Sequence, residues 1–301
     1  MRLTLTVLMG LAVHLTAQAQ NAWLQLNQGY SPESRLELEK SFSFFESCEA
    51  MPGKVVGRDS VTSRVRAISI EIYRPREGAR GKRVLIVPPW GGVSAMDRDY
   101  ARQFCGRGIE AWVITEWEPG VKDYQLSLDL RSHDWAARRA VTAVRQVVGQ
   151  MRGPVGILGT SAGAIIASVA IAIEPRLRAG VLIAGGAGMD EIVASSDAEV
   201  MVALRNARER QYGWSHSQYR AYLKQYIQLD VRDFAQGFRG KRIGTIIATS
   251  DNTVPLRNQL LLERISGAKR LATYDYTHTW AIVMSYVWTS PKVVQFFERN
   301  L

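Results

Sequence analysis

Residues 155–163 read VGILGTSAG, an apolar run that leads into a Gly-x-Ser-x-Gly pattern. The run is typical of a strand buried on both faces, and the small and branched residues at 162–173 favour a helix. A sharp strand-to-helix turn would hold the Ser161 hydroxyl exposed above the edge of a sheet. Gly159 and Gly163 suit this turn because side chains there would clash with its crowded backbone. The residues expected in the turn are Gly159, Thr160, Ser161, Ala162 and Gly163.

The same alternation of strand and helix continues on both sides of this turn. Strands are predicted at 64–73, 84–87, 109–115, 155–159, 179–186, 242–250 and 269–274. Helices are predicted at 97–107, 133–151, 162–173, 255–266 and 280–299. This order favours right-handed crossovers and a mostly parallel, doubly wound α/β sheet with helices on both faces.

Two stretches depart from the alternation. Residues 189–240 are helical, polar and rich in aromatic residues, and they are too long for a plain connection, so we expect a cap inserted over one end of the sheet. Residues 20–58 form an N-terminal extension in which helix and strand signals conflict, and its structure stays open. The main domain is expected to span 59–301.

Composition excludes several classes of protein. The 301 residues are 47% hydrophobic and 22% charged, which is ordinary for a globular chain and not for a disordered one. The formal charge is +10, but basic runs with interleaved aromatic residues are absent from the sequence, so we expect no nucleic-acid partner.

The first 19 residues, MRLTLTVLMGLAVHLTAQA, have the features of a cleaved signal peptide. Arg2 supplies the positive start, a short apolar stretch follows, and Ala17-Gln18-Ala19 has the form of a signal peptidase site. The mature chain would start at Gln20 and be secreted or periplasmic. We expect no membrane span in the remainder, because no later stretch is long and apolar enough.

The two cysteines allow two interpretations. In an oxidising compartment Cys48 and Cys105 could form a disulfide, or both could be buried free thiols. Two cysteines and a few scattered histidines without HxxxH or HxH spacing offer no set of metal ligands, so we expect no metal.

A serine needs a base and an orienting carboxylate to act as a nucleophile. Asp251 directly follows a predicted strand, and His278 follows the last one, in the order Ser161, Asp251, His278. The carboxyl edge of a parallel sheet is where such groups gather. Asp190, after the preceding strand, is the alternative acid. The two other histidines of the mature chain are His133 and His216.

The loop PPWGG at 88–92 follows the strand 84–87. Attack on a carbonyl builds negative charge on its oxygen, which backbone amides can stabilise. We expect one donor at Ala162 and a second at Trp90, with Gly91 as the next choice. Proline has no amide hydrogen, which excludes the first two residues of the loop.

These motifs resemble the α/β-hydrolase family over roughly residues 60–301, through GTSAG, SDNTVP (250–255) and YTHTW (276–280). The resemblance implies a mostly parallel sheet of about eight strands, in which the first strands form an antiparallel edge. It also implies a cofactor-independent serine hydrolase with Ser161 as nucleophile, His278 as base and Asp251 as acid. Many relatives have His-Gly where this chain has Pro88-Pro89. This departure bears on which backbone amide of the loop is the second donor to the carbonyl oxygen.

An ester is the expected substrate, either a small molecule or one derived from a polymer, because an alkoxide leaves more readily than an amine. A peptidase or amidase with the same triad is the alternative, and a non-catalytic binding module is a third reading. Four tryptophans are candidates for an apolar or sugar-stacking pocket: Trp90, Trp112, Trp117 and Trp280. For Trp112, which lies inside a predicted strand, filling of the core is the preferred interpretation.

Overall fold

The computed structural model describes residues 24, 26–27, 30–39, 42–45, 47–79, 81–116 and 127–301. The predicted signal peptide at 1–19 and Trp117 lie outside these residues.

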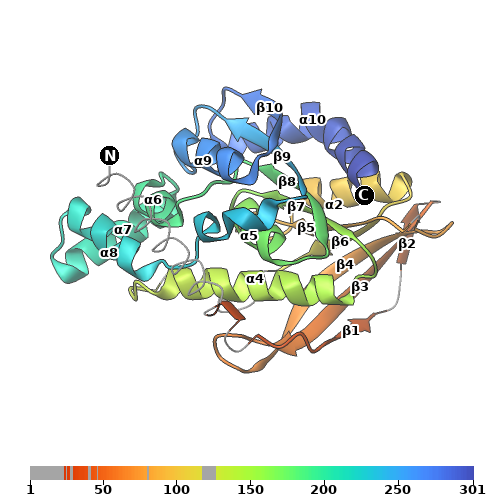
Figure 1. Cartoon of the computed structure of the whole chain (residues 1–301), viewed down its shortest axis with the longest axis horizontal. Coiled ribbons are helices and arrows are strands. Elements are labelled where there is room, and N and C mark those ends of the chain that lie inside the picture. Colours follow the sequence, from red (N-terminus) through yellow and green to blue (C-terminus); the bar gives the residue numbers. More distant parts are fainter. Residues whose placement is uncertain are drawn as a thin grey trace, which may run out of the picture.

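The strands form one twisted sheet (Figure 1). In chain order they are β1 (Ser34–Leu38), β2 (Phe42–Phe45), β3 (Cys48–Arg58), β4 (Val65–Pro75), β5 (Arg83–Val87), β6 (Glu110–Ile114), β7 (Val155–Thr160), β8 (Leu177–Ile183), β9 (Arg242–Ala248) and β10 (Lys269–Tyr274). The spatial order is β1-β3-β4-β6-β5-β7-β8-β9-β10, with β2 on β3. The six strands from β6 to β10 in this order are parallel, and β4 joins them antiparallel. The predicted mostly parallel sheet is confirmed.

The N-terminal segment that the sequence left open extends this sheet to ten strands. Strand β3 pairs antiparallel with β4 from Cys48 opposite Pro75 to Arg58 opposite Val65. A disulfide joins Cys48 to Cys105, with 6.2 Å between the two Cα atoms. The bond therefore links β3 to the helix that carries Cys105.

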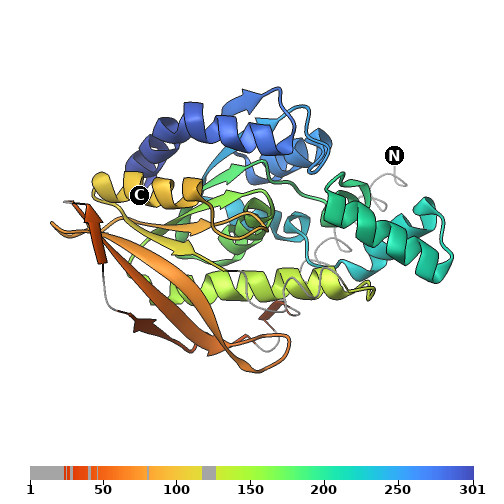
Figure 2. The ribbon, with the colours of Figure 1, turned by 180° about the vertical axis from the view of Figure 1, so that it is seen from behind.

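Helices cover both faces of the sheet (Figure 2). In chain order the described helices are α2 (Ala95–Gly106), α4 (Ser132–Gln150), α5 (Ala162–Ile173), α6 (Met189–Ser195), α7 (Glu199–Tyr212), α8 (His216–Tyr226), the 3-10 helix η1 (Val231–Phe238), α9 (Leu256–Ser266) and α10 (His278–Asn300). One core layer contains the buried faces of α4, α5 and α9, and the other contains those of α2 and α10. The parallel strands are covered on both sides, which explains why β5 reads as a continuous apolar run.

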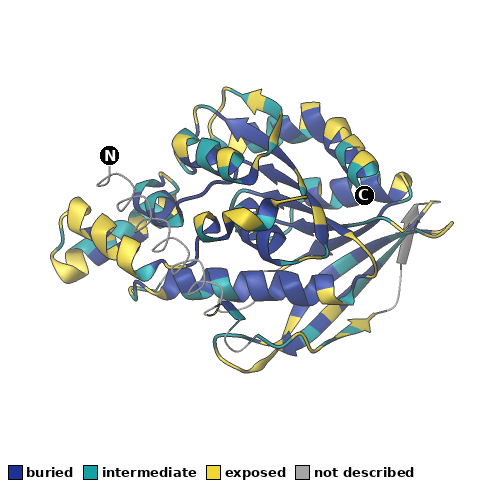
Figure 3. Ribbon diagram, in the orientation of Figure 1, coloured by how far each residue is buried: buried dark blue, intermediate teal, exposed yellow. Residues whose placement is uncertain are grey.

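Four helical segments, α6, α7, α8 and η1, lie between β8 and β9. Helices α7 and α8 extend beyond the sheet and are mostly exposed (Figure 3). The buried Arg208 ties α7 to the body, since its guanidinium donates to the carbonyl oxygens of Ser127 and Asp129 at 2.7 and 2.9 Å. Among the residues that the structure describes, no helix has the length and apolar character needed to cross a membrane.

Candidate active site

Ser161 occupies the turn between β7 and α5 in an unusual backbone conformation. Its φ is 55° and its ψ is −123°, a region that non-glycine residues rarely adopt. A Cβ at Gly163 would lie 2.2 Å from the Val87 carbonyl oxygen, and one at Gly159 would lie 2.7 Å from the Ala164 Cα. Glycine is therefore required at both positions for the turn to close, as the sequence predicts.

The Ser161 hydroxyl contacts an imidazole. Its Oγ lies 2.7 Å from His278 Nε2. His278 is the first residue of α10, so this helix begins two residues earlier than predicted. Strand β10 and the short turn after it bring the histidine back to the carboxyl edge of the sheet, 117 residues from the serine in sequence.

Asp251 lies on the other side of the imidazole. Its Oδ2 is 2.6 Å from His278 Nδ1, and Asp251 as a whole residue is only 3% exposed. Its other oxygen, Oδ1, accepts hydrogen bonds from the backbone amides of Thr253 and Val254, both at 2.8 Å. These two amides hold the carboxylate in one orientation, with Oδ2 toward the histidine.

Gln259 on α9 adds a further contact that the sequence analysis missed. Its Nε2 donates to Asp251 Oδ2 at 3.1 Å and to the Val254 carbonyl at 2.7 Å. Its Oε1 accepts from the Ala248 amide at 3.0 Å. The sequence pattern did indicate that Gln259 is buried, because it precedes the buried Leu262 by three residues and so lies on the apolar face of a predicted helix.

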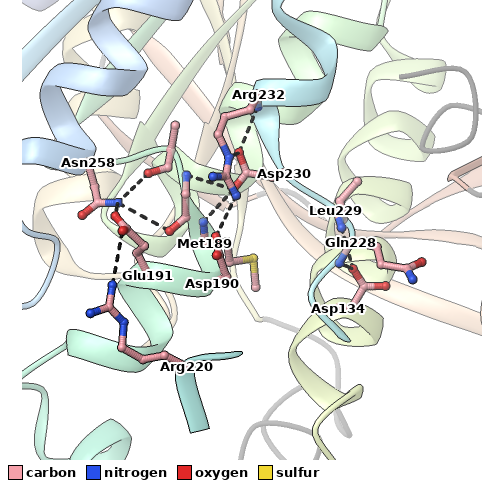
Figure 4. Close-up of polar contacts among 12 residues, drawn as sticks. Asp134, Met189, Asp190, Glu191, Arg220, Gln228, Leu229, Asp230, Arg232 and Asn258 are labelled. Atoms are coloured by element: carbon pink, nitrogen blue, oxygen red, sulfur yellow. Dashed lines mark hydrogen bonds and ion pairs between the residues drawn. The ribbon is translucent and has the colours of Figure 1, made fainter. Parts of the chain in front are cut away.

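Asp190, the alternative acid, is placed elsewhere. Its Oδ1 lies 2.7 Å from Arg232 Nη2, and Arg232 Nε also lies 2.8 Å from Asp230 Oδ1 (Figure 4). The structure thus brings Asp251, and not Asp190, to the imidazole of His278. His216 is exposed and lies 3.1 Å from Glu209 on the outer helices.

The loop at 88–92 lies beside the nucleophile turn. The Gly92 amide donates to the Pro89 carbonyl at 3.0 Å, which closes a tight turn around Trp90 and Gly91. Ala162 is the first residue of α5, so its amide has no acceptor within the helix. Trp90, Gly91 and Ala162 all border the same cavity as Ser161.

That cavity has a volume of about 410 Å³ and is formed by the sheet edge together with α4, α5, α6, α7 and α10. Its wall is largely apolar, and the buried His133 also borders it. Of the described tryptophans, Trp90 alone borders it. Trp112 is buried in β6, as preferred from the sequence, and Trp280 is 58% exposed outside the cavity. Within the described part of the chain, no group of three or more His, Cys, Asp or Glu side chains could hold a metal ion.

Comparisons with known proteins identify the fold. No protein-family model matches this sequence, and no curated protein matches it. The structure is similar to acetyl xylan esterase 1 from Thermoanaerobacterium sp. JW/SL YS485, with a TM-score of 0.68 and 15% identity over 89% of this chain and 92% of that one.

It is also similar to an acetyl xylan esterase from Paenibacillus sp. R4, with a TM-score of 0.67 and 16% identity over 95% and 94% of the two chains. A third similar structure is the Pyrococcus horikoshii acylaminoacyl peptidase, with a TM-score of 0.59 and 13% identity over 85% of this chain and 42% of that one. The chain has the α/β-hydrolase fold, as the sequence motifs predict.

Proposed function

We propose that this protein is a serine hydrolase that cleaves carboxylic esters through an acyl-enzyme intermediate. The observation that carries the proposal is the continuous chain of contacts from Ser161 through His278 to Asp251, at 2.7 and 2.6 Å. A serine hydroxyl, a base and an orienting carboxylate within hydrogen-bond reach form the arrangement that activates a serine.

In the first step, His278 Nε2 removes the Ser161 proton as Oγ forms a bond to the substrate carbonyl carbon. Asp251 holds the imidazole by its Nδ1–H and stabilises the positive charge that the ring gains. The bond to the alkoxide then breaks, and the alkoxide leaves as an alcohol with the proton from His278.

The negative charge that develops on the carbonyl oxygen needs fixed donors. The Ala162 amide supplies one, at the positive end of α5, and the turn after β5 supplies the other through Trp90 or Gly91. In the second step water takes the place of the alcohol. His278 removes a proton from the water, which attacks the acyl carbon, and Ser161 regains its proton when the acid leaves.

Two of the similar structures are esterases, which supports an ester as the substrate. The similar acylaminoacyl peptidase supports amide cleavage as the second candidate, because the same constellation can attack an amide. A p-nitrophenyl ester and the matching p-nitroanilide distinguish these candidates, and we expect the ester to react faster.

Two further features belong to this proposal. Residues 189–240 act as a cap, because α6 and α7 border the cavity. Residues 1–19 direct export, which the Cys48–Cys105 disulfide supports, since such bonds persist in oxidising compartments.

The decisive experiment is Ser161→Ala. We expect kcat for p-nitrophenyl butyrate to fall by about 10⁴-fold or more, because no other group can form the acyl-enzyme. Labelling by a fluorophosphonate probe should vanish as well. Ser168→Ala is the matched control, since Ser168 is a buried serine on α5, the helix that follows Ser161, and its hydroxyl donates to the Ile165 carbonyl. Full activity in a folded Ser161→Ala protein would exclude the serine mechanism.

A further inference from the structure

Helix α10 has a buried face and an exposed face along most of its length. The buried residues recur every four positions, so they lie on the side of the helix that packs on the sheet: Ala281, Ser285, Thr289, Val293 and Phe297. The other side, here called the outer face, is exposed to solvent (Figure 3). Because α10 begins at His278, the outer face starts beside the candidate active site.

The first half of the outer face is apolar. Trp280, Val287 and Trp288 are 58%, 55% and 70% exposed, and the partly exposed Met284 lies between them. The spacing of these residues places all four on one side of the helix. Apolar side chains gathered on a protein surface mark a site of interaction, so we expect this half of α10 to contact another molecule.

The apolar half reaches the cavity next to Ser161. Val283 borders that cavity, and it lies three residues after Trp280 and four before Val287, which makes these three side chains neighbours on the helix. The cavity has a volume of about 410 Å³ and a largely apolar wall. A molecule on the outer face of α10 therefore lies beside the site where an ester would react.

The second half of the outer face is basic. Lys292 follows Trp288 by one helical turn, and it borders a groove of about 540 Å³ together with Arg299, Arg242 of β9 and Lys269 of β10. All four basic side chains are exposed. Within the described part of the chain, none of the four forms an ion pair, and neither an aspartate nor a glutamate borders the groove. The groove therefore presents unmatched positive charge to solvent.

Neighbouring acidic residues do not neutralise these four cations. Glu263 is paired with Arg270, which also borders the groove, at 2.6 Å. Glu298, the only acidic residue of α10, faces Arg107 at the end of α2 at 3.4 Å. The positive charge at this end of α10 is therefore available to an anionic partner.

Tryptophan beside lysine and arginine is a combination that favours a lipid surface. The indole ring has an apolar body and one N–H donor, and tryptophan concentrates in the headgroup layer of membranes. Lysine and arginine attract anionic headgroups. A second copy of this chain fits poorly, because it would bring the same cations, and the one carboxylate of its α10 is already paired. Charge complementarity therefore favours an anionic lipid surface as the partner.

We propose that the outer face of α10 docks on an anionic phospholipid surface. Trp280 and Trp288 enter the headgroup layer, and Lys292 and Arg299 contact the phosphates. Docking places the rim of the cavity at Val283 against the surface, so that an ester with an apolar chain passes from the lipid into the cavity. This inference goes beyond ester hydrolysis, because docking needs no chemical step at the serine.

Sedimentation with lipid vesicles tests the docking directly. The protein is mixed with vesicles of phosphatidylcholine alone, or of phosphatidylcholine and phosphatidylglycerol in equal parts. We expect affinity for the anionic vesicles to be higher by about tenfold or more, and the difference to shrink as salt rises from about 0.05 M to about 0.5 M. Ser161→Ala should bind as wild type does, so a failure of the proposed hydrolysis and a failure of docking are distinguished.

Two sets of variants separate the apolar half from the basic half. Trp288→Ser should weaken binding to both kinds of vesicle by about tenfold, because the indole no longer enters the headgroup layer. Lys292→Gln combined with Arg299→Gln should weaken binding to the anionic vesicles by about 20-fold, since each cation near such a surface contributes roughly fivefold. None of these side chains borders the cavity, so kcat for p-nitrophenyl butyrate should stay within about twofold of wild type.

Matched controls carry similar changes elsewhere on the surface. Val287→Ser should weaken vesicle binding by a fewfold, whereas Val65→Ser, at an exposed valine of β4, should not. Arg64→Gln combined with Lys224→Gln removes the same net charge before β4 and on α8, and it should weaken binding by less than about threefold. Thermal melts show whether each variant is folded, and if Trp288→Ser fails to fold, Val287→Ser decides.

The inference is wrong if wild type binds neither kind of vesicle, or if Trp288→Ser and Val287→Ser both bind as wild type does. It is also wrong if the control pair Arg64→Gln and Lys224→Gln weakens binding as much as the pair on α10, because the overall charge then explains the attraction. Sedimentation velocity gives the last outcome. A wild-type dimer that Trp288→Ser converts to a monomer, without vesicle binding, would make this face a contact between two copies and overturn the inference.

Discussion

The regions after β8 and β9 lie at the same edge of the sheet, and each presents an aspartate, but the two aspartates differ in their partners. Asp251 receives two backbone amides and a glutamine amide, and it faces His278. Asp190 faces the guanidinium of Arg232. A carboxylate paired with a permanent cation holds two segments together, whereas one held by neutral amides keeps its charge for an imidazole. The hydrogen-bond and ion-pair partners of each aspartate, more than its position at the sheet edge, therefore distinguish Asp251 from Asp190.

The comparison is tested most strongly by Asp251→Asn. We expect kcat for p-nitrophenyl butyrate to fall by about 10³ to 10⁴-fold, because an amide in place of the carboxylate favours the wrong tautomer of His278. The shape of the side chain is kept, so the melting temperature should change by only a few degrees. A loss of kcat below tenfold would contradict the assignment of Asp251.

Gln259→Met tests whether the side-chain amide that donates to Asp251 contributes to catalysis. We expect kcat to fall by about tenfold with KM nearly unchanged, because Asp251 loses one donor and gains freedom to turn. Stability should fall by about 1 to 3 kcal/mol, since the Ala248 amide loses its acceptor.

The matched control for this variant is Asn258→Leu, which removes a buried amide on the same helix that donates to the Ala187 carbonyl at 2.8 Å. It should reduce stability similarly and leave kcat within about twofold. Equal effects of the two substitutions on kcat would show that Gln259 is structural only.

Asp190→Asn is expected to have the smallest effect. Arg232 keeps Asp230 as a partner at 2.8 Å, and its side chain is partly exposed. We therefore expect kcat within about threefold of wild type and a loss of roughly 0.5 to 1 kcal/mol in urea unfolding. A larger loss of kcat here than in Asp251→Asn would reverse the assignment of the two acids.

Local patterns predicted most of the fold. The helix expected at 162–173 is α5, and the strand expected at 269–274 is β10. Apolar periodicity is strong where elements are buried, which is the case for the parallel strands and their helices. At the N-terminus, helix and strand signals conflict and leave the structure open, because β1 is short and has no buried residue.

Local sequence alone predicted the turn around Ser161, because steric crowding admits only small neighbours there, and it placed Asp251 and His278 after strands in a known order. Packing in three dimensions decided the remainder. The choice of Asp251 over Asp190, the support from Gln259 and the pairing of Cys48 with Cys105 depend on distances between segments far apart in the chain.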